Sequence, residues 1–205
     1  MAGDIPEREI SNRRQQPPPL RIREKVLRKG RQVVRKSENI VLIGMPGVGK
    51  STIGVILAKV LSRDFLDTDV YIQAEEGRTL QEIIDREGME KFCELEERYV
   101  TSVARRGAVI ATGGSVVYSD LAMVHLKSQG VVLHLSLPIH LLEKRLTDFT
   151  TRGVVKKSAQ TFIELYDERI PLYERYADST IDCTGMGHEE VVKVILSRLK
   201  ERSNE

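Results

Sequence analysis

The chain has few cysteines and no long hydrophobic run, and these two absences exclude several classes of protein. Only Cys93 and Cys183 occur among 205 residues, too few for a disulfide framework and without the spacing of metal ligands. No stretch approaches the roughly 18 apolar residues of a membrane span, and no apolar segment follows the basic amino terminus. We therefore expect a cytoplasmic protein with free thiols, without a membrane partner or a secretory signal.

The amino-terminal segment, residues 1–37, lacks aromatic residues and recognisable motifs but is strongly basic. It carries eleven Lys or Arg against four Asp or Glu, a net charge of +7, so residues 38–205 must carry −5 to give the whole-chain +2. Pro17 to Pro19 exclude a helix there, and residues 20–34 form only a weak amphipathic pattern. A basic arm could bind nucleic acid or an anionic surface. Without aromatic side chains to stack on bases, we favour a solvated, partly disordered extension and expect no nucleic-acid partner.

Residues 44–51, GMPGVGKS, match the phosphate-binding pattern G-x-x-x-x-G-K-[ST]. The apolar run 39–43 before them is typical of a strand buried in a parallel sheet, and residues 50–61 after them are typical of a helix. A glycine-rich turn that merely connects the two elements is the alternative, but the strand and helix contexts favour a nucleotide site. The candidate nucleotide-binding residues are Gly44, Met45, Pro46, Gly47, Val48, Gly49, Lys50, Ser51 and Thr52.

Each residue type in this loop has a chemical reason. Glycines let the backbone turn its amides around a phosphate, and the amino end of the following helix points its dipole at the same place. Lys50 supplies a positive charge for the outer phosphates, and the Ser51 hydroxyl is a candidate ligand of Mg²⁺. The sequence therefore predicts ATP and Mg²⁺ as cofactors.

Beyond the loop, strand-like and helix-like segments alternate without an internal repeat, which predicts one α/β domain with a five-stranded parallel sheet and helices on both faces. The strands are expected at 39–43, 65–67, 108–112, 131–137 and 180–183. The helices are expected at 50–61, 80–86, 91–105, 120–128, 140–146, 159–176 and 189–202. Ligands should then bind at the carboxyl ends of the strands.

Two aspartates follow the second predicted strand, in the stretch 65–69, FLDTD. Asp67 and Asp69 can point to different tasks, one toward Mg²⁺ and one toward an acceptor hydroxyl. Such a pair can also be only a helix cap, with Asp69 capping the helix that follows. Their position after a phosphate loop favours the functional interpretation.

With these motifs in order, residues 39–199 resemble the shikimate kinases, small P-loop kinases of the nucleoside monophosphate kinase superfamily. The resemblance rests on GMPGVGKST, FLDTDVYI, GRTLQEIIDREGMEKF, the TGG of residues 112–114, and RIPLYERYAD from Arg169. It implies a three-layer P-loop NTPase fold with a mobile lid at about residues 147–160.

The resemblance also implies roles for individual residues. Asp67 corresponds to a metal-side aspartate, and Asp69 to the one that binds the acceptor hydroxyl and takes its proton. Gly113 and Gly114 correspond to a glycine turn whose amides approach the acceptor. Arg169 corresponds to the arginine that clamps the acceptor carboxylate.

Two further arginines complete the implied site. Arg152 resembles the lid arginine that closes over the phosphates, where a positive charge counters the charge that develops in transfer. Arg145 stands where the family stacks an arginine on adenine, although an exposed helix arginine is an equal alternative.

Three departures from the family pattern affect chiefly the acceptor side. Shikimate kinases place an arginine after a phenylalanine to grip the acceptor carboxylate, whereas Phe92 is followed here by Cys93, our remaining candidate for the acceptor site. Ser115 replaces the third glycine of the turn, and the lid reads RGVV at 152–155 in place of Arg-Pro-Leu-Leu. Loss of a charged partner removes about 1.5 to 3 kcal/mol of hydrogen bonding, enough to change which acid is preferred.

We therefore expect a kinase that phosphorylates a hydroxyl of a small carboxylate metabolite, with Lys50, Asp69 and Arg152 as the catalytic residues. Shikimate is the acceptor implied by the resemblance. Homoserine is a close rival, because its ammonium could pair with Asp69 and its carboxylate with Arg169. A non-catalytic nucleotide-binding regulator is less favoured, because it would not need all of these residues. We expect a monomer or weak dimer.

Overall fold

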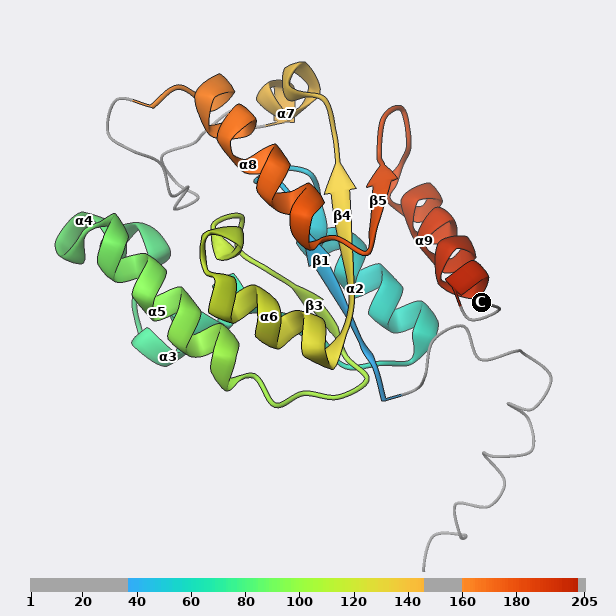
Figure 1. The fold of residues 1–205 in the computed structure, drawn as a ribbon, viewed down its shortest axis with the longest axis horizontal. Coiled ribbons are helices and arrows are strands. Elements are labelled where there is room, and N and C mark those ends of the chain that lie inside the picture. Colours follow the sequence, from blue (N-terminus) through green and yellow to red (C-terminus); the bar gives the residue numbers. More distant parts are fainter. Residues whose placement is uncertain (1–36, 146–159, 203–205) are drawn as a thin grey trace, which may run out of the picture. The chain divides into compact units, whose positions relative to one another are not determined.

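Five parallel strands form the centre of the fold, in the spatial order β2-β3-β1-β4-β5 (Figure 1). The computed structural model describes residues 37–145 and 160–202. The strands are β1 (Asn39–Ile43), β2 (Phe65–Asp67), β3 (Val109–Ala111), β4 (Gly130–Ser136) and β5 (Ser179–Asp182). The predicted five-stranded parallel α/β sheet is confirmed, with strand ends within one residue of the expected ones.

The central strand β1 is buried along its whole length. Ile40 lies opposite Val109 of β3 and Val131 of β4, so β1 is paired in parallel on both edges. A strand enclosed in this way has no polar face, which explains its uninterrupted run of apolar side chains. Its carboxyl end at Ile43 therefore opens into the phosphate-binding loop at the middle of the sheet.

Helices cover both faces of the sheet (Figure 1). α2 packs against α9 on one face, whereas α5 packs against α6, and α6 and α8 contact β4 on the other. This division follows from right-handed crossovers between parallel strands. The helices are α2 (Lys50–Leu61), α3 (Thr68–Glu76), α4 (Leu80–Glu87), α5 (Met89–Ser102), α6 (Asp120–Gln129), α7 (Ile139–Arg145), α8 (Phe162–Tyr176) and α9 (His188–Arg202), with a 3₁₀ turn η3 at Val116–Tyr118.

Helices α3, α4 and α5 share a small hydrophobic cluster separate from the main core. Its buried members are Ile72, Leu80, Ile83, Phe92 and Leu95. These helices therefore bury part of their apolar side chains against one another. The cluster holds the amino-terminal half of α5, which includes Phe92.

Helix α3 was not among the helices that we predicted. Only Thr68 and Ile72 are buried in it, so its apolar periodicity is too weak to recognise. Its start is fixed instead by Asp67, whose carboxylate accepts hydrogen bonds from the backbone amides of Asp69 and Val70. The cap is therefore Asp67, and the less favoured alternative, in which Asp69 caps this helix, is wrong.

Helix boundaries differ from the predicted ones by up to three residues. α5 ends at Ser102 because Val103 has extended backbone, and α8 begins at Phe162 because Thr161 and Glu164 form a capping box. The predicted extension and lid, apart from Ser37 and Gln160, lie outside the described residues. No helix within the described ranges is long and apolar enough to cross a bilayer.

Candidate functional site

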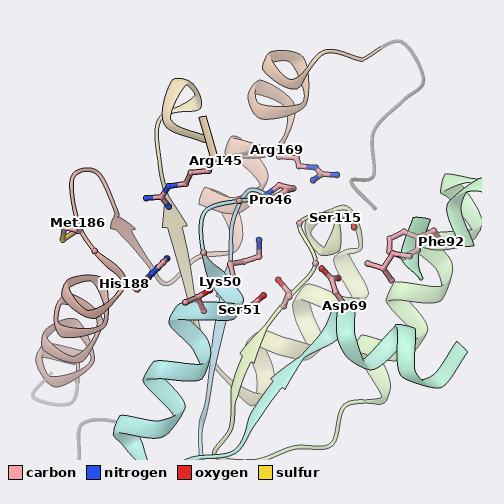
Figure 2. A pocket seen from close by; sticks show the side chains of 18 residues that line it. Pro46, Lys50, Ser51, Asp69, Phe92, Ser115, Arg145, Arg169, Met186 and His188 are labelled. Atoms are coloured by element: carbon pink, nitrogen blue, oxygen red, sulfur yellow. The ribbon is translucent and has the colours of Figure 1, made fainter. Parts of the chain in front are cut away.

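A cavity of about 570 Å³ opens at the carboxyl ends of the central strands (Figure 2). Lys50 lies at its centre, Asp69, Ser115 and Phe92 lie on one side, and Met186 and His188 lie on the other. The lining residues are Pro46, Gly47, Gly49, Lys50, Ser51, Thr52, Asp69, Leu80, Phe92, Thr112, Gly113, Gly114, Ser115, Arg145, Arg169, Met186, Gly187 and His188. Most of the residues predicted from separate motifs therefore meet in one place.

The loop between β1 and α2 has the backbone conformation that its glycines permit. Gly44 has φ 142°, and a Cβ there would lie 2.5 Å from the carbonyl oxygen of Leu135, so no other residue fits. Gly49, with φ 109°, precedes the first residue of α2. The backbone amides at this helix start are left for a ligand, which suits an anionic group such as phosphate.

The Lys50 ammonium lies against the inside of this loop. It donates hydrogen bonds to the carbonyl oxygens of Gly44 at 2.7 Å and Met45 at 3.0 Å. Burial lowers the pKa of Lys50 to about 8, an effect that the charge of Asp69 opposes. The side chains of Met45 and Val48 instead enter the hydrophobic core, so these two residues can offer a nucleotide only their backbone.

The two aspartates after β2 are separated by the structure. The Asp69 carboxyl lines the cavity, and burial, followed by the charge of Asp67, raises its pKa to about 6. Asp67 does not line the cavity and uses one oxygen to cap α3. Of the two, only Asp69 lines the cavity.

The glycine turn after β3 lies against two carboxyl groups. A Cβ on Gly113 would lie 2.2 Å from Oε1 of Glu96 and 2.7 Å from Oδ1 of Asp69, so a side chain there would displace both carboxyl groups. Ser115 donates a hydrogen bond from its hydroxyl to Oε2 of Glu96 at 2.7 Å. The third residue of the turn, a departure from the family pattern, thus has a defined partner.

Glu96 is a residue that sequence reasoning missed. It is 2% exposed, and its Oε1 has no hydrogen-bond partner among the described residues. Burial, followed by the charge of Asp69, raises its pKa to about 7. Its position in the buried stripe of α5, between Leu95 and Val100, was the available signal, because an acidic residue on an apolar helix face requires an explanation.

Arg169 reaches the same turn from α8. It is 1% exposed, and its Nη1 would lie 3.0 Å from a Cβ on Gly114. Its Nε donates a hydrogen bond to the hydroxyl of Tyr118 at 3.1 Å, and the guanidinium carbon lies 5.0 Å from the centre of that ring. The cation predicted for the acceptor carboxylate therefore borders the cavity in a fixed orientation.

The opposite side of the cavity contains residues that we did not predict. Met186 and Gly187, between β5 and α9, and His188, the first residue of α9, line it together with the predicted Arg145. Figure 2 shows Met186, His188 and Arg145 on this side. Arg145 is solvent-exposed but donates a hydrogen bond to the carbonyl oxygen of Val48, at 3.3 Å. This loop has no charged motif; the detectable signal was its position at the carboxyl end of the last strand.

Besides Gly44, Met45, Val48 and Asp67, two further predicted residues are not among the described residues that line the cavity. Cys93 lines a neighbouring hollow of about 510 Å³, which shares Ser115 with the first one. Burial and the nearby charge of Glu96 raise the pKa of its thiol to about 11, so Cys93 supplies no charge at neutral pH. Arg152 lies outside the described residues.

The available oxygen ligands suit magnesium held mainly by a nucleotide. Within residues 37–145 and 160–202 no three His, Cys, Asp or Glu side chains converge on a metal site. The two predicted ligands are the hydroxyl of Ser51, which lines the cavity, and the carboxylate of Asp67, which does not line it and caps α3 through Oδ1. Mg²⁺ at phosphate sites keeps several waters and needs only one or two protein ligands, so this pair fits.

Comparisons with known proteins agree on one family. Residues 46–200 match the family model described as shikimate kinase. The chain is 37% identical over 170 residues to the shikimate kinase of Thermodesulfovibrio yellowstonii, covering 82% of this chain and 98% of that one. It is 35% identical to the shikimate kinase of Enterococcus faecalis, covering 80% and 99%.

Solved structures give the same result. The shikimate kinase from Acinetobacter baumannii in complex with shikimate superposes with a TM-score of 0.75 at 31% identity, covering 81% of this chain and 94% of that one. The shikimate kinase from Aquifex aeolicus superposes with a TM-score of 0.69 at 30% identity, covering 80% and 98%. The likeness therefore extends over nearly the whole length of these relatives.

Proposed function

Because the chain belongs to the shikimate kinase family, we propose that its cavity transfers the terminal phosphoryl group of ATP to the 3-hydroxyl of shikimate. The chain is a small-molecule kinase, and the family implies ATP as the phosphoryl donor. The observation that carries the proposal for the site is that Lys50 and Asp69 line one cavity with Arg169. A phosphate-binding cation, an acceptor-side carboxylate and a carboxylate-binding cation are thereby brought together.

ATP would be bound by the phosphate-binding loop and by residues on the side of the cavity opposite Asp69. The amides at the start of α2 and the Lys50 ammonium bind the phosphates and neutralise the charge that develops in transfer. Ser51 and Asp67 would hold Mg²⁺, which would withdraw charge from the phosphates when bound. Arg145 and His188 lie on the side of the cavity opposite Asp69, where they would contact the base of the nucleotide.

Binding of the acceptor would depend on the charge of Arg169 and on close approach of the acceptor to the backbone of the glycine turn. Arg169 binds the carboxylate, and the absence of side chains at Gly113 and Gly114 lets the acceptor reach the backbone of the turn. Asp69 orients the hydroxyl in line with the phosphoryl group. A general base works best when its pKa lies near the pH of the reaction. The raised pKa of Asp69, about 6, therefore suits it to accept the proton of the hydroxyl near neutral pH.

Some parts of the proposal concern residues outside the cavity or the described ranges. We propose that Arg152 closes over the phosphates from a lid at residues 147–160, and that residues 1–37 form an extension of a kinase domain at 38–205. We also propose the cytoplasm as its compartment, where Cys93 and Cys183 are free thiols, and a monomer or weak dimer as its state. Each of these remains a prediction.

Cys93 is the reason to test homoserine beside shikimate. Without an arginine at that position, Arg169 is the one cation from the described residues that lines the acceptor side. A hydroxy amino acid carries its own ammonium, which could balance the carboxylates around Gly113. The relatives named above are shikimate kinases, so shikimate is the acceptor that we propose.

The test is kcat/KM for both acceptors with wild-type protein and the Cys93→Arg variant. Wild-type protein should use shikimate better than homoserine at equal concentrations. If homoserine is preferred and Cys93→Arg shifts the preference toward shikimate, the acceptor assignment is wrong while the kinase assignment stands. If neither protein uses either acceptor, both acceptor assignments are wrong, and an unidentified hydroxy acid is then the acceptor to search for. ATP turnover that depends on a small acceptor would exclude a non-catalytic nucleotide-binding regulator.

A further inference from the structure

Helix α8 presents two buried side chains to the glycine turn, and only one of them has an explanation in the proposed reaction. Arg169 and Tyr173 are four residues apart, so they lie on the same face of the helix. Arg169 is 1% exposed and Tyr173 is 0% exposed. Arg169 lines the cavity and serves the acceptor carboxylate, whereas Tyr173 does not line it.

Tyr173 is nevertheless connected to the cavity wall by a hydrogen bond. Its hydroxyl donates to the carbonyl oxygen of Gly114 at 2.6 Å. Because a peptide group is planar, fixing this carbonyl also fixes the direction of the amide N–H of Ser115. Gly114 and Ser115 both line the cavity, so the hydroxyl of one buried tyrosine determines how the backbone of the turn faces an acceptor.

The ring of Tyr173 packs against a side chain of the sheet. His134 of β4 stacks on it, with ring centroids 5.1 Å apart and an interplanar angle of 23°. His134 is 1% exposed, and neither ring nitrogen has a hydrogen-bond partner among the described residues. Burial lowers the pKa of His134 to about 4, so the imidazole is neutral at physiological pH and provides a flat surface for the phenol ring.

The neighbours of this carbonyl in the turn are held at other groups: the Gly113 amide donates a hydrogen bond to Thr68 at 3.0 Å and the Ser115 hydroxyl to Glu96 at 2.7 Å, whereas Tyr173 holds the carbonyl of Gly114. Gly114 has no side chain to pack, and glycine backbone is the most free to change conformation. The guanidinium of Arg169 lies close to Gly114, where Nη1 would be 3.0 Å from a Cβ, so a shift of the turn would also change the space beside the carboxylate-binding cation. A small change at the Gly114 carbonyl is therefore transmitted to both acceptor contacts.

We propose that Tyr173 is a positioning residue for the acceptor, acting through its hydrogen bond to Gly114 and its interaction with Arg169 while His134 holds its ring. This inference rests on the proposed function, because it assumes that the acceptor lies against the glycine turn. Among the interactions described, the Tyr173 hydroxyl bonds to the glycine turn and to no residue of the phosphate loop, although Pro46 of that loop lies 3.0 Å from the position of a Cβ on Gly114. Tyr173 should then affect acceptor binding far more than nucleotide binding.

The test replaces only the hydroxyl. Tyr173→Phe should raise KM for shikimate about tenfold and leave KM for ATP within about twofold, because misplacement of a binding group by a fraction of an ångström weakens only the contacts that it makes. Tyr176→Phe is the matched control, since Tyr176 lies three residues further along α8, is 7% exposed and donates its hydroxyl to Asp120, away from the cavity. The control should change neither KM.

KM does not depend on how much of the protein is active, so a modest loss of stability leaves this measurement valid. If Tyr173→Phe does not fold, His134→Ala removes the support of the ring and should raise the same KM severalfold. An unchanged KM for shikimate, or an equal rise in KM for ATP, overturns the inference. Wild-type protein that is inactive on shikimate instead overturns the proposed acceptor, and the same variants are then compared on homoserine.

Discussion

Glu96→Gln should make the protein more stable at pH 8 than the wild type, although it removes a charged group. Glu96 is 2% exposed, Ser115 satisfies one of its oxygens at 2.7 Å, and the other oxygen has no hydrogen-bond partner among the described residues. Glutamine has the same shape and can still accept the Ser115 hydrogen bond. It differs in having no proton to lose.

The size and direction of the effect follow from the raised pKa of Glu96. In the unfolded chain the carboxyl has its ordinary pKa of 4.5, whereas burial and the charge of Asp69 raise the pKa to about 7 in the folded protein. Between these values the folded state binds more protons than the unfolded one, so stability is lost as pH rises from 4.5 through 7. At 1.36 kcal/mol per pKa unit the full loss is at most about 3 kcal/mol, or roughly 6 to 12 °C in Tm for a domain of this size.

The measurement is the unfolding free energy of wild type and Glu96→Gln from pH 5 to pH 8. The two proteins should be close in stability at pH 5, and the variant should gain progressively toward pH 8. Glu97→Gln is the control, because Glu97 makes the corresponding hydrogen bond with Ser119, at 2.6 Å, but is less buried. A difference between wild type and Glu96→Gln that does not vary with pH would refute the buried, proton-binding state of Glu96.

Three further predictions address the other parts of the molecule. Lys50→Ala should reduce kcat at least ~10²-fold with an unchanged circular dichroism spectrum, since its ammonium contacts phosphates; wild-type rates would refute the nucleotide site. Asp69→Asn should depress phosphorylation strongly while KM for ATP stays within a few fold; loss of ATP binding with retained acceptor binding would mean that the roles of Asp67 and Asp69 are exchanged. Deletion of residues 1–36 should leave kcat and Tm nearly unchanged, and an unstable truncated protein would show that this segment packs on the domain.

The phosphate side of the site could be predicted from the sequence because it is local. Gly44 to Ser51 are consecutive, so the conformations required by their glycines and the start of α2 determine the loop without knowledge of the rest of the fold. Arg145 and Arg169 were predicted only through the family resemblance, and both line the cavity. No periodicity or spacing within α7 or α8 would have selected them from the other arginines of the chain.

The residues that sequence reasoning missed are those whose position depends on contacts between distant elements. The loop at 184–188 becomes part of the site only because β5 lies beside β4 at the edge of the sheet. Asp67 and Asp69 could be recognised as a functional pair, but which of them caps α3 depends on the backbone direction at the end of β2. Spacing alone could not distinguish a carboxylate that faces the cavity from one that faces the helix.

The two departures at Cys93 and Ser115 lie 22 positions apart in the sequence, yet they converge on a single carboxyl group. Ser115 donates a hydrogen bond to Glu96, and the charge of Glu96 contributes to the raised pKa of the Cys93 thiol. An arginine at position 93 would bring a cation near Glu96 and favour its ionised form, whereas the serine hydroxyl satisfies only one of its two oxygens. Because both residues act on the same group, their effects on acceptor preference are coupled and cannot be assigned to either one alone. The acceptor side must therefore be compared with that of other shikimate kinases as a set of three residues, Cys93, Glu96 and Ser115, rather than as two separate substitutions.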